Sequence, residues 1–523
     1  MKNFILVAVA ALMAASCEKS GQDLPPAPCG PDSVGHDMIE LGQKLDNPYK
    51  LDNVKAALQA LYPTKAGRID VSPTNLYVRF LPRDQAEFDV LTSLGVEMVD
   101  HPVDYEIIKD GDYYHDPSID SDSITWQYAV LDKDFVFPSG IIYEVLDECY
   151  IKDGAATRAS DGIDWDAVER KSYEMTGNSD LLAEMTKGGS SSPEGRVTIV
   201  DEKANGGKPF GVAGAQVVVN SFVKIGKAYT DRDGYYKINK SYSSKIRYRL
   251  VFKNTKGFRI GFNMVLVPAS FSTFGKGEPS GLDARIDASS NRKLFCRCVV
   301  NNAAYDYYER CASTDMNISL PPSDLRFWIF QNIDESSAVM LRHGAIVSSN
   351  KLLQLYLGTY MGLIKKFLPD ITIGAKSKAS YSDLYSATVH ELAHASHFAQ
   401  AGTSYWDKYI MYILESWASG GNCYGSASDK NSGYCEVGEM WAYHVETMMY
   451  YERYGGNLPN FGTSWWFYPQ IFRNLEDRGL SRSQIFSALS SDVTSLDLLK
   501  TRLGTLYPTS KTTIDQVFNR YAR

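Results

Sequence analysis

Two histidines that stand four residues apart have the spacing of two ligands for one metal ion. His390 and His394 lie in the segment TVHELAHASH, residues 388–397, which contains neither proline nor glycine and therefore favours a helix. Because an α-helix advances 3.6 residues per turn, the two imidazoles project from one face, one turn apart. A single tetrahedral zinc ion needs two ligands in this arrangement, so the pattern predicts a Zn²⁺ site.

Glu391 follows the first of these histidines directly. From that position its carboxylate can take a proton from an activated water and pass it to a leaving amine. His397 is the third histidine of the segment, but it lies seven residues, about 10.5 Å along the helix axis, from His390. That distance is too long for both rings to bind the same ion. The sequence therefore predicts a hydrolytic centre in which Glu391 is the general base.

A third protein ligand has to come from a later segment, and three glutamates are candidates: Glu415, Glu436 and Glu439. We favour Glu439, because it is expected to begin a long uninterrupted helix. Ala442, one turn later, is small enough to let that helix approach the histidine helix closely. The helix that carries Glu415 is expected to break at residues 419–421, a Ser-Gly-Gly run. Glu415 and Glu436 stay open as alternatives.

The residues after His394 indicate which family of zinc peptidases the motif resembles. A metzincin has glycine and histidine three and six residues later, where this chain has His397 and Gln400. The pattern instead resembles the gluzincins, the thermolysin-like peptidases, and the Glu-x-x-Ala segment that begins at Glu439 is similar to the one with which many of those families supply their third ligand. The resemblance implies Zn²⁺ held by the two motif histidines and Glu439, in a mainly α-helical zincin-like domain. It also implies hydrolysis of peptide bonds in a protein or peptide substrate.

Hydrolysis by such a centre also needs a hydrogen-bond donor for the developing oxyanion, commonly Tyr or His. Tyr434, Tyr443 and His444 are close in sequence to Glu439. Tyr443 is equally suited to orient a metal ligand. The pattern alone does not choose among these roles.

Two cysteines enclose the loop between the candidate glutamates. Cys423 and Cys435 stand on either side of a stretch rich in Gly, Ser and Asn. A disulfide between them would close a short loop and stabilise the fold by about 3 kcal/mol. Such a bridge would serve either as a rigid wall of the cleft or for stability alone, and the sequence does not determine the pairing of the cysteines.

The first residues indicate export. Lys2 precedes an apolar run, residues 4–15, that is too short to span a bilayer comfortably, which predicts a signal peptide over residues 1–16. The run ends in Ala-Ala-Ser-Cys, which resembles a bacterial lipobox. This resemblance implies a lipid on Cys17, a tether over residues 17–38 and a place in the cell envelope. We expect the anchor in the outer membrane, on its periplasmic or exposed side.

The chain of 523 residues is longer than one core usually organises, so we expect a multidomain α+β protein. Residues 75–80 alternate as a half-buried strand does, a helix is predicted from Asp84 to Leu94, and residues 96–99 can form a second strand. These elements predict a small α+β domain over residues 39–150. A helical segment and a Gly-Ser-rich linker occupy residues 151–193.

The middle of the chain is predicted to be a β-sandwich, residues 194–285. Short strands alternate there with Gly and Asp turns, among them Asp231-Arg232-Asp233-Gly234. The segment resembles the carboxypeptidase regulatory-like domain, a transthyretin-like sandwich. The rest, residues 286–523, is expected to be mainly helical. Its predicted elements are helices at 351–367, 481–489, 496–503 and 512–521 and a strand at 371–373.

Composition restricts the partners. The net charge of −8 and the absence of a basic stripe argue against nucleic-acid binding. A β-sandwich in an envelope protein suits contact with a glycan or glycoprotein. A rival hypothesis is therefore an envelope lipoprotein that binds glycan or protein through its sandwich while its zincin domain is catalytically silent.

Overall fold

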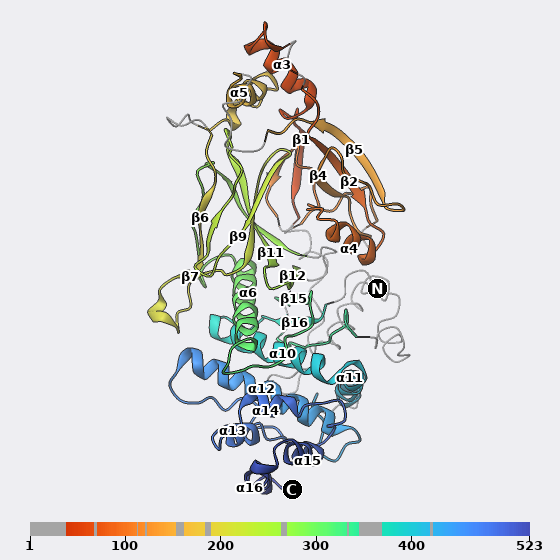
Figure 1. The fold of residues 1–523 in the computed structure, drawn as a ribbon, viewed down its shortest axis with the longest axis vertical. Coiled ribbons are helices and arrows are strands. Elements are labelled where there is room, and N and C mark those ends of the chain that lie inside the picture. The colour runs from red at the N-terminus through yellow and green to blue at the C-terminus, as the bar shows by residue number, and fades with distance from the viewer. Residues whose placement is uncertain are drawn as a thin grey trace.

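The computed structural model describes most of the chain after its N-terminal segment. The described residues are 38–66, 69, 71–111, 113–120, 123–152, 162–183, 190–262, 269–331, 334–344, 369–418 and 422–522. The predicted signal peptide, Cys17, nearly all of the predicted tether and the predicted helix at 351–367 lie outside them. Where it is described, the fold is mixed α/β, with helices concentrated in the C-terminal part. The N-terminal part and the C-terminal helices lie at opposite ends of the molecule's long axis (Figure 1).

The N-terminal part is built on a three-stranded antiparallel sheet in the order β4-β2-β5. Its elements are β1 (Glu40–Lys44), α3 (Leu51–Leu61), β2 (Asn75–Leu81), α4 (Gln85–Ser93), β3 (Tyr105–Lys109), β4 (Gln127–Asp132), β5 (Ile142–Cys149) and α5 (Trp165–Met175). The predicted strand at 75–80 is confirmed as β2, and the predicted helix is confirmed as α4. The side chain of Asp84 caps that helix by accepting a hydrogen bond from the backbone N–H of Glu87.

The predicted strand at 96–99 is wrong. Only an isolated bridge joins Val99 to Tyr128. Val96 is 4% exposed and packs with Val78 and Leu91 in the small core beneath the sheet. The apolar residues of this segment therefore fill a core without forming a ladder of backbone hydrogen bonds.

The middle part contains two sheets, one in the order β10-β6-β14 and a larger one in the order β16-β15-β12-β11-β8-β9; β7 pairs with β6, and β13 pairs with β11. Their strands up to residue 286 are β6 (Glu194–Ile199), β7 (Phe210–Gly211), β8 (Ala215–Ser221), β9 (Lys224–Tyr229), β10 (Tyr235–Lys237), β11 (Ile246–Asn254), β12 (Arg259–Phe262), β13 (Phe271–Gly277) and β14 (Ala284–Ile286). The turn predicted at 231–234 joins β9 to β10, and the carboxylate of Asp231 accepts hydrogen bonds from the backbone of Asp233 and Tyr235.

The larger sheet continues past the boundary predicted between residues 285 and 286. β12 pairs in parallel with β15 (Arg326–Phe330), which pairs in parallel with β16 (Ile371–Gly374), the strand predicted at 371–373. A single hydrophobic core includes Leu250 of β11, Phe327 of β15 and Leu392 of the helical part. The strands of the middle part and the C-terminal helices are therefore joined by a continuous sheet and a shared core.

The C-terminal part consists mainly of helices packed side by side at one end of the molecule (Figure 1). They are α6 (Arg292–Cys311), α10 (Tyr381–Ala401), α11 (Thr403–Ala418), α12 (Ser432–Tyr454), α13 (Gln470–Glu476), α14 (Arg482–Ser487), α15 (Leu496–Leu506) and α16 (Lys511–Asn519). The last three confirm the helices predicted after residue 480. None of the helices in the described ranges combines the length and the apolar character that crossing a bilayer needs.

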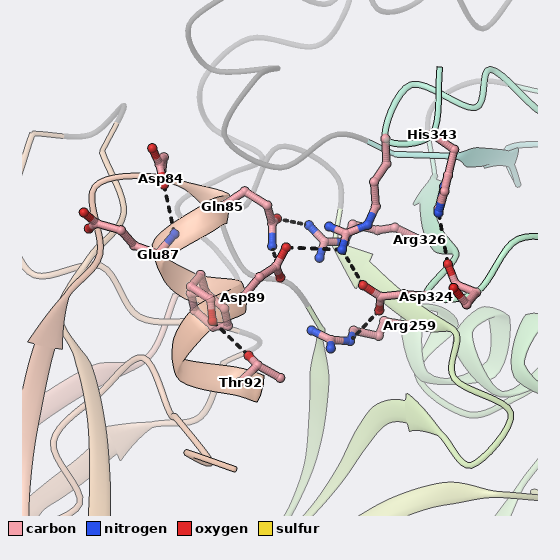
Figure 2. Close-up of polar contacts among 12 residues, drawn as sticks. Asp84, Gln85, Glu87, Asp89, Thr92, Arg259, Asp324, Arg326 and His343 are labelled. Carbon is pink, nitrogen blue, oxygen red and sulfur yellow. Dashed lines mark hydrogen bonds and ion pairs between the residues drawn. The ribbon is translucent and has the colours of Figure 1, made fainter. Parts of the chain in front are cut away.

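Helix α4 of the N-terminal part is held against the larger sheet by polar side chains (Figure 2). Arg326, at the start of β15, donates a hydrogen bond to the side-chain oxygen of Gln85. Arg342 pairs with Asp324 and lies 3.2 Å from Asp89 of α4. These contacts fix the position of the N-terminal part relative to strands β12 and β15.

We predict that Phe327→Ala destabilises the protein by about 3–5 kcal/mol, because its ring is fully buried in the shared core. Far-ultraviolet circular dichroism during denaturation reports the helices, and hydrogen exchange in β8 and β11 reports the sandwich. The free energies of unfolding that the two methods report are expected to fall by the same amount. Leu320→Ala, at a side chain that is 48% exposed, is the control and is expected to cost little. Destabilisation confined to the helices would contradict the shared core.

Candidate metal centre

The predicted HExxH segment lies on α10, a 21-residue helix with a well-formed start. Ser380 and Asp383 form a capping box, in which each side chain accepts a hydrogen bond from the other residue's backbone N–H. α10 packs between α6 and α12. His390 is 6% exposed and His394 1%, so both motif histidines face the interior, where polar groups need partners.

Glu439 of α12 supplies the carboxylate that faces both rings. Its Oε2 lies 3.4 Å from Nε2 of His390, and its Oε1 lies 3.5 Å from Nε2 of His394. Ligand atoms bound to one tetrahedral zinc at 2.0–2.1 Å are separated by about 3.3–3.4 Å. The three ligand atoms all lie within 4.8 Å of one another. In the part of the chain that the structure describes, this is the one set of three His, Cys, Asp or Glu residues close enough to hold an ion.

The alternatives for the third ligand are placed differently. Glu415 of α11 is an exposed side chain, and Glu436 is buried one turn before Glu439 but does not join the set. The prediction that Glu439 begins its helix is wrong, because α12 already starts at Ser432. The seven residues before Glu439 place it in the middle of the helix, opposite α10.

The carboxylate of Glu439 is fully buried and has two hydroxyl donors. The phenol of Tyr409 donates to Oε1, and the phenol of Tyr424 donates to Oε2 at 3.0 Å. Burial by itself raises the pKa of Glu439, but the two imidazoles beside its oxygens outweigh burial and hold the pKa well below its usual range. Glu439 is therefore ionised at neutral pH.

The donor set fits a zinc ion. Burial lowers the pKa of His394, so its ring is neutral, the form that binds metals. Neither ring nitrogen of His394 makes a hydrogen bond with any described residue, although the ring is 1% exposed. A buried nitrogen next to a carboxylate needs a partner, and a cation provides one. Two imidazoles and a carboxylate are also a donor set of zinc sites that leave one position open.

Glu446 is a functional candidate that the sequence analysis missed. One of its oxygens lies 2.9 Å from Nδ1 of His390, and the other accepts a hydrogen bond from the hydroxyl of Ser386. A carboxylate on the outer nitrogen fixes the tautomer of a histidine and leaves Nε2 unprotonated toward the metal. Glu446 stands seven residues, about two helical turns, after Glu439 and thus on the same face. That spacing was the available signal in the sequence.

Tyr443 lies beside the metal ligands. Its ring centroid is 4.5 Å from that of His390, and its hydroxyl is 3.1 Å from the hydroxyl of Tyr424. Gly462 approaches the ring so closely that a Cβ atom there would lie 2.5 Å from it. Tyr443 is therefore held in place between the loop at Gly462 and His390.

The other aromatic and histidine candidates face elsewhere. Nε2 of His444 lies 3.2 Å from the carboxylate of Glu476, away from the metal ligands. Tyr434 packs against Tyr405 with ring centroids 4.9 Å apart. His397 is fully buried, and its ring centroid lies 4.9 Å from that of Tyr405, so it neither joins the ligands nor faces water.

Glu391 is 2% exposed and follows His390 on α10. Its charge raises the pKa of two groups at the site, His390 and the Tyr409 phenol, although hydrogen bonds and burial affect these groups more strongly. Glu391 is thus a buried carboxylate next in sequence to His390, and its role as general base stays a prediction.

The predicted disulfide between Cys423 and Cys435 is wrong. Cys435 is a free thiol with no exposed surface, whereas Cys423 belongs to a different disulfide. α12 begins at Ser432, before Cys435, and directs this thiol into the helical core. Burial raises its pKa, as expected for a thiol that serves as a small apolar side chain.

Comparisons with known proteins give no relative. No model of a known protein family matches the chain, and neither a curated protein nor a solved structure does. Any function for this chain therefore has to be argued from the geometry of its own side chains.

We predict that Glu446→Gln lowers the affinity for Zn²⁺ by about 10–100-fold, because the amide no longer holds the His390 tautomer with a charge. Competition with a chromophoric chelator measures the change. Glu415→Gln, on the exposed side of α11, is the matched control and should bind like the unaltered chain. A loss in the control equal to that in Glu446→Gln would refute the assignment.

Proposed function

We propose that this protein is a zinc-dependent peptidase. The observation that carries the proposal is the convergence of His390 and His394 of α10 with Glu439 of α12, which is 45 residues after His394, in the buried core. Glu391, the buried residue after His390, is the proposed general base. The fit of this donor set to zinc, and the carboxylate behind His390, support the proposal further.

The chain's own residues have distinct roles in this proposal. Zinc, when bound, supplies a Lewis acid that activates water and polarises a carbonyl. Glu391 accepts a proton from the attacking water and delivers it to the nitrogen of the leaving amine. The hydroxyl of Tyr443, beside His390, is the nearest of the three sequence candidates to donate a hydrogen bond to the oxyanion. Tyr409 and Tyr424 hold Glu439 in place.

One observation favours a second function. The three candidate ligands are between 0 and 6% exposed, a degree of burial that also suits a structural metal. In that case the protein would bind glycan or protein through its β-sandwich, and the zincin domain would be silent. Glu391 argues against this alternative, because a structural site does not need a carboxylate at that position.

The location is part of the proposal. We infer an exported lipoprotein whose Cys17 carries the lipid, from the basic start, the short apolar run and the small residues before the cysteine. Metabolic labelling with a fatty acid tests this point. Label on the unaltered chain and none on Cys17→Ala supports it, and equal label on both contradicts it.

We expect Glu391→Gln to keep a full complement of zinc and to lose at least about 10²-fold in the rate of casein or glycoprotein cleavage, because the proton acceptor is gone. His390→Ala is expected to lose the metal and the activity together. Zinc content by mass spectrometry and cleavage by gel electrophoresis measure both effects, with Glu415→Gln as the control. Equal metal loss in Glu391→Gln and His390→Ala would refute the assigned roles. Bound zinc without cleavage of either substrate would favour the silent alternative.

Metal removal should also affect stability. Zinc binds the folded chain through ligands from both α10 and α12, so zinc in hundredfold excess over its dissociation constant is expected to raise the free energy of unfolding by about 2.7 kcal/mol. Thermal unfolding before and after treatment with a chelator measures this change. The same experiment on His390→Ala should show no effect of zinc. Stabilisation of that variant by zinc would show that the ion binds elsewhere.

A further inference from the structure

The N-terminal part covers the outer face of the larger sheet and leaves a cavity of about 110 Å³ between them. One wall comes from α4 and from residues 96–100 of the N-terminal part, and the other from strands β8, β9 and β11. Figure 2 shows the neighbouring contacts that hold α4 in this position. Helix α4 and strands β9 and β11, which contribute to the walls of the cavity, lie apart from α10 and α12, the helices that carry the candidate metal ligands (Figure 1).

The pleat of the sheet determines which side chains reach this cavity. Arg249 and Val251 of β11 stand opposite Val218 and Gln216 of β8, and all four point to the outer face. The intervening residues, such as Leu250, point to the core of the sandwich. A charged side chain on the outer face would normally be solvated, but the N-terminal part covers Arg249 until only 3% of it is exposed.

Arg249 is a buried cation without a directly bonded anion. Its guanidinium makes a single hydrogen bond, from Nη2 to Nε2 of His101 at 3.0 Å, and no described carboxylate forms an ion pair with it. The carboxylate of Asp100 contacts the other ring nitrogen of His101, Nδ1, at 2.7 Å and does not contact Arg249 directly. Burial and the charge of Arg247 lower the pKa of Arg249 to about 10, so it stays protonated at neutral pH. Buried charges in folded proteins are normally paired.

Two carboxylates line the cavity, Asp100 and Glu97, and neither pairs directly with Arg249. Besides its contact with His101, Asp100 accepts a hydrogen bond from the backbone N–H of Tyr114. Glu97 lies 2.5 Å from the ammonium group of Lys227 and 3.5 Å from that of Lys253, so its carboxylate is already paired with these two lysines. The amide nitrogen of Gln216, whose side chain is 2% exposed, has no hydrogen-bond partner among the described residues. A second polar group is thus also left without a partner at this cavity.

The remaining lining is mainly apolar. Phe88 of α4, Val96, Val218 and Val251 contribute aliphatic or aromatic surface, and the Phe271 ring lies 5.5 Å from the Arg249 guanidinium. Ligand sites at domain interfaces have this composition, with apolar walls and a few polar groups that orient the ligand. The cavity volume of about 110 Å³ leaves room for a ligand with a short hydrocarbon chain.

We propose that this cavity is a binding site for a small aliphatic carboxylate, whose carboxylate pairs with Arg249 and whose hydrocarbon end packs against Val218 and Val251. The site is separate from the candidate metal centre and does not depend on the proposed peptidase activity. The ligand would supply the anion that Arg249 lacks. It would also join the N-terminal part to the sandwich, because both contribute to its walls.

Isothermal titration calorimetry of the full chain with butyrate tests the proposal. Butyramide has the same shape without the charge, and inorganic phosphate has the charge without the hydrocarbon. We expect butyrate to bind at millimolar concentrations and to raise the melting temperature, with each of the other two at least about tenfold weaker. No binding of butyrate, or equal binding of butyramide or phosphate, would overturn the proposal.

Two variants locate the binding. Arg249→Met removes the charge and is expected to weaken butyrate binding at least about tenfold. Val251→Phe fills the cavity while keeping the charge, and it decides the question if the first variant does not fold. Arg285→Met, at an exposed arginine of β14 paired with Asp287, is the control and should bind butyrate normally. Unchanged binding in Val251→Phe would show that butyrate binds elsewhere and would refute the site.

Discussion

The structure around the candidate site depends on one buried electrostatic contact, that of the Glu439 carboxylate with the His390 and His394 rings. A carboxylate with no exposed surface is costly unless charges and hydrogen bonds compensate it. The two imidazoles lie 3.4 and 3.5 Å from its oxygens, and two tyrosine hydroxyls complete its shell. A divalent cation in this place would neutralise the carboxylate and bind the free nitrogens of the histidines at the same time.

The rest of the fold holds α10 and α12 in position relative to each other. α10 is enclosed by α6 and α12, and α6 packs in turn on the larger sheet. At the far end of α12, Arg453 forms an ion pair with Asp201 of the sandwich at 3.0 Å, and its guanidinium lies over the rings of Tyr381 and Tyr385. Arg453 is fourteen residues after Glu439, four turns along the same helix face. The sandwich therefore contributes directly to the position of the helix that carries Glu439.

Local patterns were sufficient for the elements whose signal is contained in a few neighbouring residues. The HExxH spacing, the cap at Asp84 and the turn at 231–234 depend on nearby side chains, and the structure has the expected helices and turn at these places. Tertiary contacts were not accessible in the same way. Tyr409 and Tyr424 reach Glu439 from a different helix and a loop, and the interval between them and Glu439 carries no periodic signal.

The failed predictions have a common physical cause. The segment 96–99 has the composition of a strand, but Val96 packs into a core and only Val99 pairs with a neighbouring strand, at a single bridge to Tyr128 of β4. Cys435 is near Cys423 in sequence, yet the turn of α12 points its thiol inward. The parallel pairing of β12 with β15, which the sequence analysis did not predict, joins residues more than sixty positions apart and has no local signal. Each case was decided by packing between distant segments.

The most direct test of the central claim is an anomalous X-ray diffraction signal at the zinc edge from crystals of the zinc-loaded protein. We predict a peak about 2.0–2.2 Å from Nε2 of His390, from Nε2 of His394 and from a carboxylate oxygen of Glu439. A peak that is absent there, or that is coordinated by Glu415 or Glu436 in place of Glu439, would contradict it.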